Sequence, residues 1–219
     1  MNPLAPDLAD RLDAVLCIGA HADDIEIGCA GTLLHLVRAN PAMRVDWIVL
    51  SASGQRADEA RTAAAKVLGA DQGRDGGVRI EAFTERYFPA IYGDLKHYFD
   101  DLGARVRPDL IFAPRRADEH QDHRVTAELT WQTFRAQPIL EYEIVKYEGD
   151  LGRPNVYVAL SEQVVDEKLS LLHEAFASQR DRYWFSDETF RGLLRTRGIE
   201  CRAPSGYAEA FHGDKLRLL

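Results

Sequence analysis

Short apolar segments alternate along the chain with longer amphipathic segments. The apolar segments predict strands at residues 14–18, 45–50, 78–83, 110–113, 140–147 and 156–160. The amphipathic segments predict helices at 32–39, 56–68, 91–106, 126–134 and 162–197, the last of them interrupted near 186–187. Such alternation is typical of an α/β fold with a mostly parallel sheet.

The length and composition favour a single domain. The chain has 219 residues, of which 46% are hydrophobic, and this is enough for one full hydrophobic core. No internal repeat or clear linker divides it, so we expect one domain over residues 1–219. We also expect the C-terminal third, about 150–219, to contribute to the substrate pocket, because the motifs described below leave that part of the chain unassigned.

The charge and the cysteine content indicate which binding partners and which cellular compartment to expect. The formal net charge of −8 argues against non-specific nucleic-acid binding, which needs a basic surface. The chain has three cysteines, Cys17, Cys29 and Cys201, and their odd number and wide spacing imply no disulfide framework. A reducing compartment is therefore favoured. Residues 1–7 lack the features of a signal peptide, and no apolar run reaches membrane-span length. We expect a cytoplasmic protein with no nucleic-acid or membrane partner; a homo-oligomer remains open.

Two polar clusters follow predicted strands. The run 19–24 reads Gly-Ala-His-Ala-Asp-Asp and comes directly after the strand at 14–18; residues 28–32, Gly-Cys-Ala-Gly-Thr, predict a glycine-rich turn after it. The run 118–124 reads Asp-Glu-His-Gln-Asp-His-Arg and follows the strand at 110–113. Because the carboxyl ends of parallel strands share one edge of a sheet, the two clusters are expected to meet there.

The residue types in these clusters point to metal-assisted hydrolysis. His21 and Asp24 are close enough in sequence to bind one ion, and His123 can complete a set of two histidines and one carboxylate. Three protein ligands leave zinc an open position for water, which is the catalytic arrangement. Asp23, next to a ligand, is suited to act as the general base.

The second cluster offers further catalytic groups. His120 can donate a hydrogen bond to a developing oxyanion or protonate the leaving amine. Asp122 can accept a hydrogen bond from a histidine and raise the basicity of that ring. The alternative interpretation is that residues 120–124 are only a polar helix start with Asp118 as its cap.

The two clusters together resemble the signatures of a known family. Residues 19–32, Gly-Ala-His-Ala-Asp-Asp-Ile-Glu-Ile-Gly-Cys-Ala-Gly-Thr, resemble the first signature of the LmbE-like, or PIG-L, family of zinc-dependent N-acetylglucosaminyl deacetylases. Residues 120–124 resemble its second signature, and the order and separation of the two also agree. The resemblance implies a Rossmann-like three-layer fold with a mostly parallel central sheet.

The resemblance also implies residue roles. One Zn²⁺ ion, or another divalent metal, is expected on His21, Asp24 and His123. Asp23 is expected to be the general base, His120 to assist the tetrahedral intermediate or leaving group, and Asp122 to orient His120.

The implied reaction is removal of an N-acetyl group from an amino sugar or sugar conjugate, so the partner is a small N-acyl amino-sugar substrate. Two alternatives stay open: an amidase that acts on a non-acetyl conjugate such as a thiol–sugar, and a catalytically silent metal-binding or sugar-binding protein. Arg56 is either a substrate contact or a solvated residue in the first turn of a helix. Residues 207–211, Tyr-Ala-Glu-Ala-Phe, are a candidate for closing the pocket.

Overall fold

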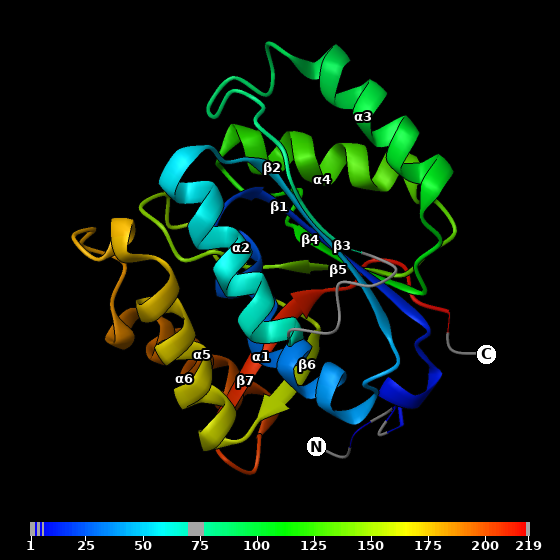
Figure 1. Ribbon diagram of the computed structural model, residues 1–219. Helices are drawn as coiled ribbons and strands as arrows, with labels where there is room; N and C mark the ends of the chain where they lie inside the picture. Colours follow the sequence, from blue (N-terminus) through cyan, green and yellow to red (C-terminus); the bar gives the residue numbers. More distant parts are fainter. Residues whose placement is uncertain (1–2, 4, 6, 70–76, 218–219) are drawn as a thin grey trace.

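The computed structural model describes residues 3, 5, 7–69 and 77–217 (Figure 1). Within these residues the strands form one seven-stranded sheet in the order β3-β2-β1-β4-β5-β7-β6. The strands are β1 (Ala14–His21), β2 (Arg44–Ser51), β3 (Gly77–Ile80), β4 (Leu110–Pro114), β5 (Ile139–Tyr142), β6 (Val156–Leu160) and β7 (Tyr207–His212). Pairing is parallel from β3 through β5, and β7 is antiparallel to both β5 and β6. The predicted α/β class with a mostly parallel sheet is confirmed.

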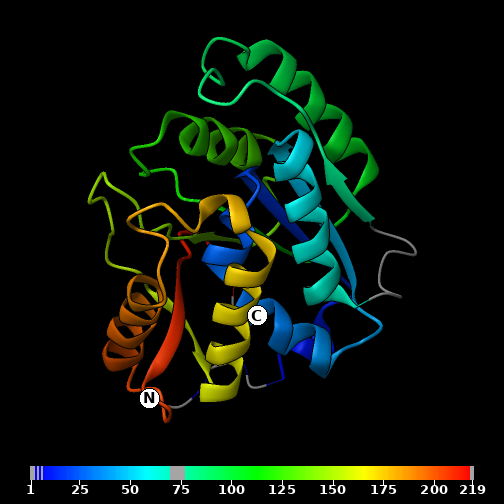
Figure 2. The ribbon, with the colours of Figure 1, turned by 60° about the vertical axis from the view of Figure 1, so that its left-hand side comes forward.

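Helices cover both faces of this sheet (Figures 1 and 2). They are α1 (Asp24–Ala39), α2 (Gly54–Leu68), α3 (Tyr92–Arg105), α4 (Gln121–Thr133), α5 (Glu162–Ala175) and α6 (Asp187–Cys201), with short 3-10 turns at Ala9–Arg11 and Ala177–Gln179. Side chains of α1, α2, α5 and α6 share one buried cluster with Val15 and Cys17 of β1. Side chains of α3 and α4 share the other with Leu16 and Ile18. Neighbouring residues of a strand point to opposite faces, and the result is the predicted Rossmann-like three-layer arrangement.

The first helix begins earlier than predicted. The sequence places a helix at 32–39 and a glycine-rich turn at 28–32, whereas α1 runs from Asp24 through this whole stretch. A Cβ atom at Gly28 would lie 2.4 Å from the ring of Tyr142 on β5. This glycine therefore allows the helix to approach the sheet closely and does not mark a turn.

Other boundaries also differ. The helix predicted at 126–134 starts at Gln121, so the second signature forms its first turn. The strand predicted at 140–147 ends at Tyr142, where its pairing with β7 stops. The predicted helix at 162–197 is divided into α5, a 3-10 turn and α6.

The segment 207–211 lies in the sheet. It forms most of β7, paired on both sides, and residues 208–211 are buried. The proposal that it closes the pocket was therefore wrong. Of the N-terminal stretch considered for a signal peptide, residues 1–2, 4 and 6 lie outside the described residues. In the described part of the chain, no helix is long and apolar enough to cross a membrane; the cytoplasmic location stays a prediction.

Candidate active site

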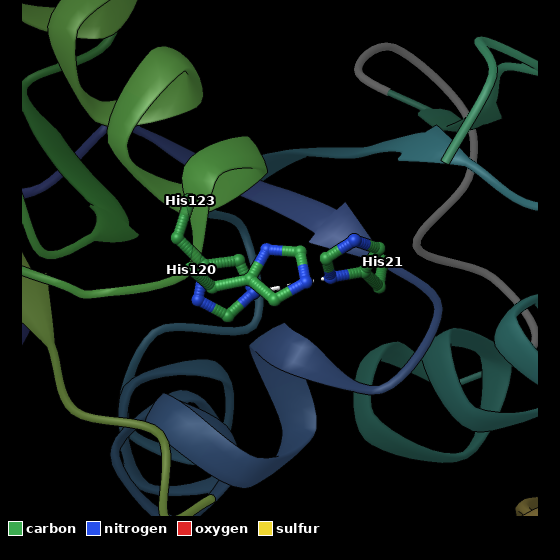
Figure 3. A group of neighbouring side chains, drawn as sticks. All are labelled: His21, His120 and His123. Carbon is green, nitrogen blue, oxygen red and sulfur yellow. Dashed lines mark hydrogen bonds between the residues drawn. The ribbon is translucent and has the colours of Figure 1, made fainter. Parts of the chain in front are cut away.

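The two polar clusters meet at the carboxyl edge of the sheet. β1 ends at His21, and α1 begins three residues later at Asp24. The neighbouring parallel strand β4 is followed by α4, which has His120 as its N-cap and carries His123 in its first turn. The imidazole rings of His21 and His123 have centroids 5.0 Å apart (Figure 3). Residues about a hundred positions apart in sequence thus come into contact, as the parallel arrangement predicts.

Three potential ligand groups converge at this point. Nδ1 of His21 lies 3.1 Å from Nε2 of His123. Asp24 contributes Oδ1 at 3.3 Å from Nε2 of His123 and Oδ2 at 3.6 Å from Nδ1 of His21. Ligand atoms around a tetrahedral zinc ion, with bonds of about 2.0–2.1 Å, are separated by about 3.3 Å. The positions and the chemistry of these donors therefore fit one zinc-like ion.

A third imidazole belongs to the same cluster. Ring nitrogens of His21, His120 and His123 all lie within 4.8 Å of one another. The ring of His120 has its centroid 4.8 Å from those of both other histidines. Its Nδ1 atom accepts a hydrogen bond from the backbone N–H of Asp122 at 3.3 Å. In the neutral ring the proton is consequently on Nε2, which is then a hydrogen-bond donor.

The electrostatics of the cluster favour a cation between the ligands. Burial alone lowers the pKa of His21, but Asp24 and Asp122 outweigh it and raise the pKa to about 10. Burial likewise lowers the pKa of His123, and Asp24 with Asp118 raises it to about 9. For Asp24, the two histidines overcome burial and hold its pKa well below the usual range. Without a metal, protons held by the two histidines therefore balance the negative charge of the carboxylates, which a bound metal ion would otherwise balance.

His120 has the opposite behaviour. Burial, together with repulsion from His123 and His21, lowers the pKa of His120. This ring is therefore neutral near pH 7, and the backbone contact to Nδ1 is consistent with that state.

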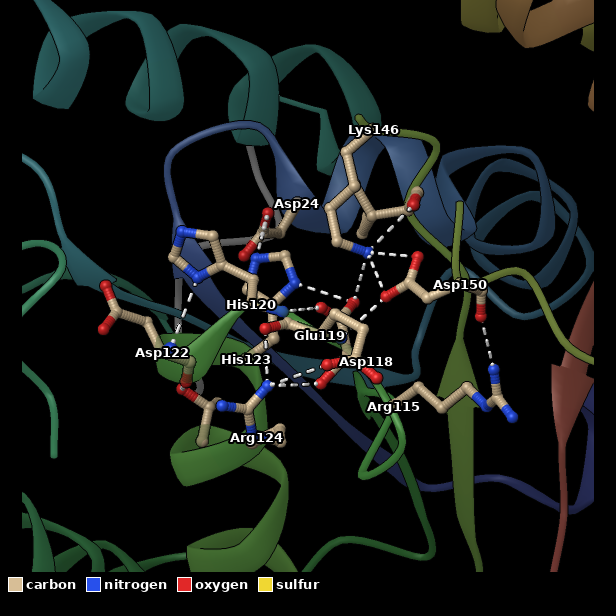
Figure 4. A network of polar contacts seen from close by, with 12 residues as sticks. Asp24, Arg115, Asp118, Glu119, His120, Asp122, His123, Arg124, Lys146 and Asp150 are labelled. Carbon is tan, nitrogen blue, oxygen red and sulfur yellow. Dashed lines mark hydrogen bonds and ion pairs between the residues drawn. The ribbon is translucent and has the colours of Figure 1, made fainter. Parts of the chain in front are cut away.

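Asp118 contacts the ring nitrogen of His123 that faces away from Asp24 (Figure 4). Its Oδ2 atom lies 2.9 Å from Nδ1 of His123, and the same oxygen accepts from Nζ of Lys146 at 2.9 Å. Lys146 also contacts Asp150 at 2.7 Å. The other oxygen of Asp118 accepts from the backbone N–H of His120 at 2.7 Å. Because His120 is the N-cap of α4, the prediction that Asp118 caps this helix was wrong. The contact between Asp118 and His123 was not predicted from the sequence, although a carboxylate five residues before a candidate ligand histidine could have indicated it. No sequence feature indicated the contact with Lys146.

Asp122 supports a different histidine from the one the family resemblance implies. Its Oδ2 atom lies 3.2 Å from Nε2 of His21. The carboxylate also accepts from the backbone N–H groups of Arg86 at 2.5 Å and Phe88 at 3.2 Å. Bonds of this kind fix the orientation of a ligand histidine and leave its other nitrogen directed at the metal.

Arg56 lies against the predicted base. Its Nη2 atom is 3.0 Å from Oδ1 of Asp23, and its Nη1 atom is 3.3 Å from Oε2 of Glu59. Burial raises the pKa of Asp23, and the Arg56 guanidinium offsets part of that rise. Neither interpretation of Arg56 from sequence included this ion pair. The structure therefore brings Asp23, Asp24, His21, His120 and His123 to one site, with Asp122 and Arg56 at its border.

Comparison with known proteins agrees with the fold. The deacetylase YaiS of Escherichia coli K12, itself uncharacterized, is 26% identical over 174 residues, covering 75% of this chain and 91% of YaiS. The N,N'-diacetylchitobiose deacetylase of Pyrococcus horikoshii shares the fold at a TM-score of 0.68, with 19% identity, over 96% of this chain and 88% of that one. GalB, the 4-carboxy-2-hydroxymuconate hydratase of Pseudomonas putida KT2440, does so at a TM-score of 0.72, with 17% identity, over 94% and 97% of the two chains.

The match to a protein family is more extensive than either signature. Residues 16–134, more than half of the chain, match the PIG-L family, described as GlcNAc-PI de-N-acetylase. This region includes the five residues that meet at the site, as well as Asp122 and Arg56 at its border. The chain therefore belongs to the PIG-L, or LmbE-like, family.

Proposed function

We propose that this protein is a zinc-dependent hydrolase that removes the N-acetyl group of an amino sugar or sugar conjugate. The observation that carries the proposal is the convergence of His21, His123 and Asp24 at separations of 3.1–3.6 Å. Family membership and the deacetylase named among its relatives support the choice of reaction. His21, Asp24 and His123 would hold one Zn²⁺ ion.

The roles of the surrounding residues follow from their contacts. A bound zinc ion would activate a water molecule and polarise the acyl carbonyl group. Asp23 would accept the proton of the attacking water, and its ion pair with Arg56 favours the anionic form that this task requires. Nε2–H of His120 would donate to the oxygen that becomes negative as the amide carbon turns tetrahedral. The proton held by Asp23 is then available to the departing amine nitrogen.

The fold adds an electrostatic contribution. The first turns of α1 and α4 both border the site, since Asp23 and His120 are the N-cap residues of these helices. The amino-terminal end of a helix carries a partial positive charge. Both helices therefore stabilise the carboxylates of the site and the negative charge that develops during hydrolysis.

The substrate is the part of the proposal that sequence and fold restrict least. The same groups serve an amidase that acts on a non-acetyl conjugate, such as a thiol–sugar, because only the pocket lining needs to differ. The experiment is to load the purified protein with Zn²⁺ and measure acetate release from a panel of N-acetyl amino sugars. N-acyl thiol–sugar conjugates form a second panel.

The variant Asp23→Asn tests the mechanism. It is expected to bind Zn²⁺ as the wild type does and to lose turnover by about 10²–10⁴-fold, the usual contribution of a general base. Asp58→Asn, an exposed change on α2, is the matched control and is expected to keep full activity. Full activity in Asp23→Asn contradicts the assignment of the base. A zinc-loaded wild type that hydrolyses neither panel favours a silent binding protein.

A further inference from the structure

Two charged side chains from the C-terminal third are buried against the middle of α1. Lys168 lies on α5 and Glu209 on β7, and their exposed fractions are 2% and 3%. Nζ of Lys168 lies 2.6 Å from Oε1 of Glu209. Figure 2 shows α5 and β7 beside the helix that they contact. The mechanism proposed above uses neither residue.

This ion pair binds backbone groups of α1. Oε1 of Glu209 accepts from the N–H of Gly31 at 2.8 Å, and Oε2 accepts from the N–H of Thr32 at 2.6 Å. Nζ of Lys168 donates to the carbonyl oxygen of Ile27 at 2.6 Å. In a regular helix the N–H of residue 31 and the carbonyl of residue 27 are partners of each other. The Lys168–Glu209 pair thus contacts both backbone groups of one i to i−4 pair of α1: Glu209 accepts from the donor, and Lys168 donates to the acceptor.

The first signature contains the residues that this arrangement needs. A Cβ atom at Gly31 would lie 2.6 Å from Cδ1 of Leu160 and 3.0 Å from Oε1 of Glu209, so only glycine lets the carboxylate reach the helix without displacement. The hydroxyl of Thr32 donates to Oε2 of Glu209 at 2.6 Å. The glycine-rich part of the first signature and the segment 207–211 are therefore two halves of one buried contact.

The part of α1 that the ion pair contacts, from Ile27 to Thr32, directly follows the first turn of the helix. The N–H of Ile27 donates to the carbonyl oxygen of Asp23 at 3.0 Å, so the residue that Lys168 holds is itself bonded to the turn bearing Asp23 and Asp24. At the other end of this turn, Oδ2 of Asp24 accepts from the backbone N–H of His21 at 2.8 Å. A shift of the helix along its axis would change both contacts together.

We propose that Lys168 and Glu209 are positioning residues that set the location of Asp23 and Asp24 relative to His21 and His123. The inference rests on the proposed metal site. A buried ion pair contributes little net stability compared with apolar residues of the same size, because both charges must leave water. Its contribution here is to fix the position of α1 along its own axis relative to α5 and β7. Only one place on α1 presents a glycine N–H, a threonine hydroxyl and a carbonyl oxygen to this pair.

The test compares Lys168→Met, Glu209→Gln and the double variant. Lys168→Met leaves a buried carboxylate without its cation and is expected to weaken Zn²⁺ binding by about tenfold or more, the range found when support of a metal ligand is lost. The double variant leaves no unpaired buried charge, but the NH2 group of the glutamine cannot accept from Gly31 or Thr32 as the carboxylate does, so only part of the affinity is expected to return. Zn²⁺ affinity is measured by competition with a chelator on fully folded protein.

A destabilised control separates positioning from general loss of stability. Leu102→Ala opens a cavity in the cluster beneath α3, on the other face of the sheet, and is expected to keep wild-type Zn²⁺ affinity. Amide hydrogen exchange of the metal-free proteins is the second readout. Residues 24–31 are expected to exchange faster in Lys168→Met than in Leu102→Ala.

The outcomes are distinct. Wild-type Zn²⁺ affinity in both Lys168→Met and Glu209→Gln, or equal losses in Leu102→Ala, overturns the positioning role and leaves the proposed function standing. A wild-type protein that binds no Zn²⁺ overturns the proposed function itself. Unchanged exchange of residues 24–31 in Lys168→Met and in the double variant overturns the inference without reference to any metal.

Discussion

Oδ2 of Asp122 lies 3.2 Å from Nε2 of His21, so a carboxylate on α4 supports a histidine at the end of β1. The same carboxylate holds the backbone of Arg86 and Phe88, which follow β3. Three segments distant in sequence are thereby joined through one side chain. Asp122 is 0% exposed, and the bonds from His21 and Arg86 overcome burial to lower its pKa.

Replacement of Asp122 by alanine is expected to weaken Zn²⁺ binding by about 10–100-fold, because His21 loses the partner that orients its ring. Affinity can be measured by chelator competition, with Glu119→Ala, an exposed change in the preceding loop, as the control. If the variant keeps its Zn²⁺ affinity and loses only kcat, Asp122 acts through His120, as the family resemblance implies.

Replacement of Arg56 by glutamine removes the cation 3.0 Å from Asp23. Because Arg56 lowers the pKa of Asp23, its loss is expected to raise that pKa. More of the base is then protonated at a given pH, so the acidic limb of the kcat/KM profile moves to higher pH while Zn²⁺ affinity stays the same. A raised KM with an unshifted profile shows instead that Arg56 contacts the substrate.

Zinc and protons are expected to compete for the same site. In the metal-free protein the neighbouring carboxylates raise the pKa values of His21 and His123 to about 10 and about 9, so at pH 7 this pair binds protons that free imidazoles would not. Binding must displace these protons, and apparent affinity therefore rises with pH, by up to about 100-fold per unit when two protons leave. Calorimetry in buffers of different ionisation enthalpy counts the protons released. Affinity that does not change between pH 6 and 9 excludes this description of the metal-free site.

A glycine substitution in α1 tests the packing of that helix, and a second one in α6, with the opposite expected effect, is its control. Gly28→Ala places a Cβ atom 2.4 Å from the ring of Tyr142 and is expected to lower the free energy of unfolding by about 1–3 kcal/mol. Gly192→Ala in α6 meets no atom within 4 Å and is expected to stabilise the protein by about 0.5–1 kcal/mol. Thermal or urea denaturation measures both. A neutral Gly28→Ala shows that α1 can move away from the sheet without cost.

The sequence by itself determined the alternation of strands and helices, except for β7, and the identity of the candidate ligands. Alternating apolar periodicity predicts the layers, because one face of each element must be buried whatever its partners are. The runs 19–24 and 118–124 predict a shared site, since parallel strands bring their carboxyl ends to one edge. Both inferences depend on local pattern and on general rules of sheet geometry.

Only the tertiary structure decided which groups support one another. Asp118 and Asp122 flank His120 in sequence at equal distances, yet their carboxylates contact His123 and His21, because the start of α4 directs them to opposite sides of the cluster. The glycines of the first signature predict a turn from the sequence, whereas in the structure Tyr142 and Glu209, from strands far along the chain, pack against them within a helix. A side chain's partner depends on which surfaces the folded chain brings together, and local sequence does not contain that information.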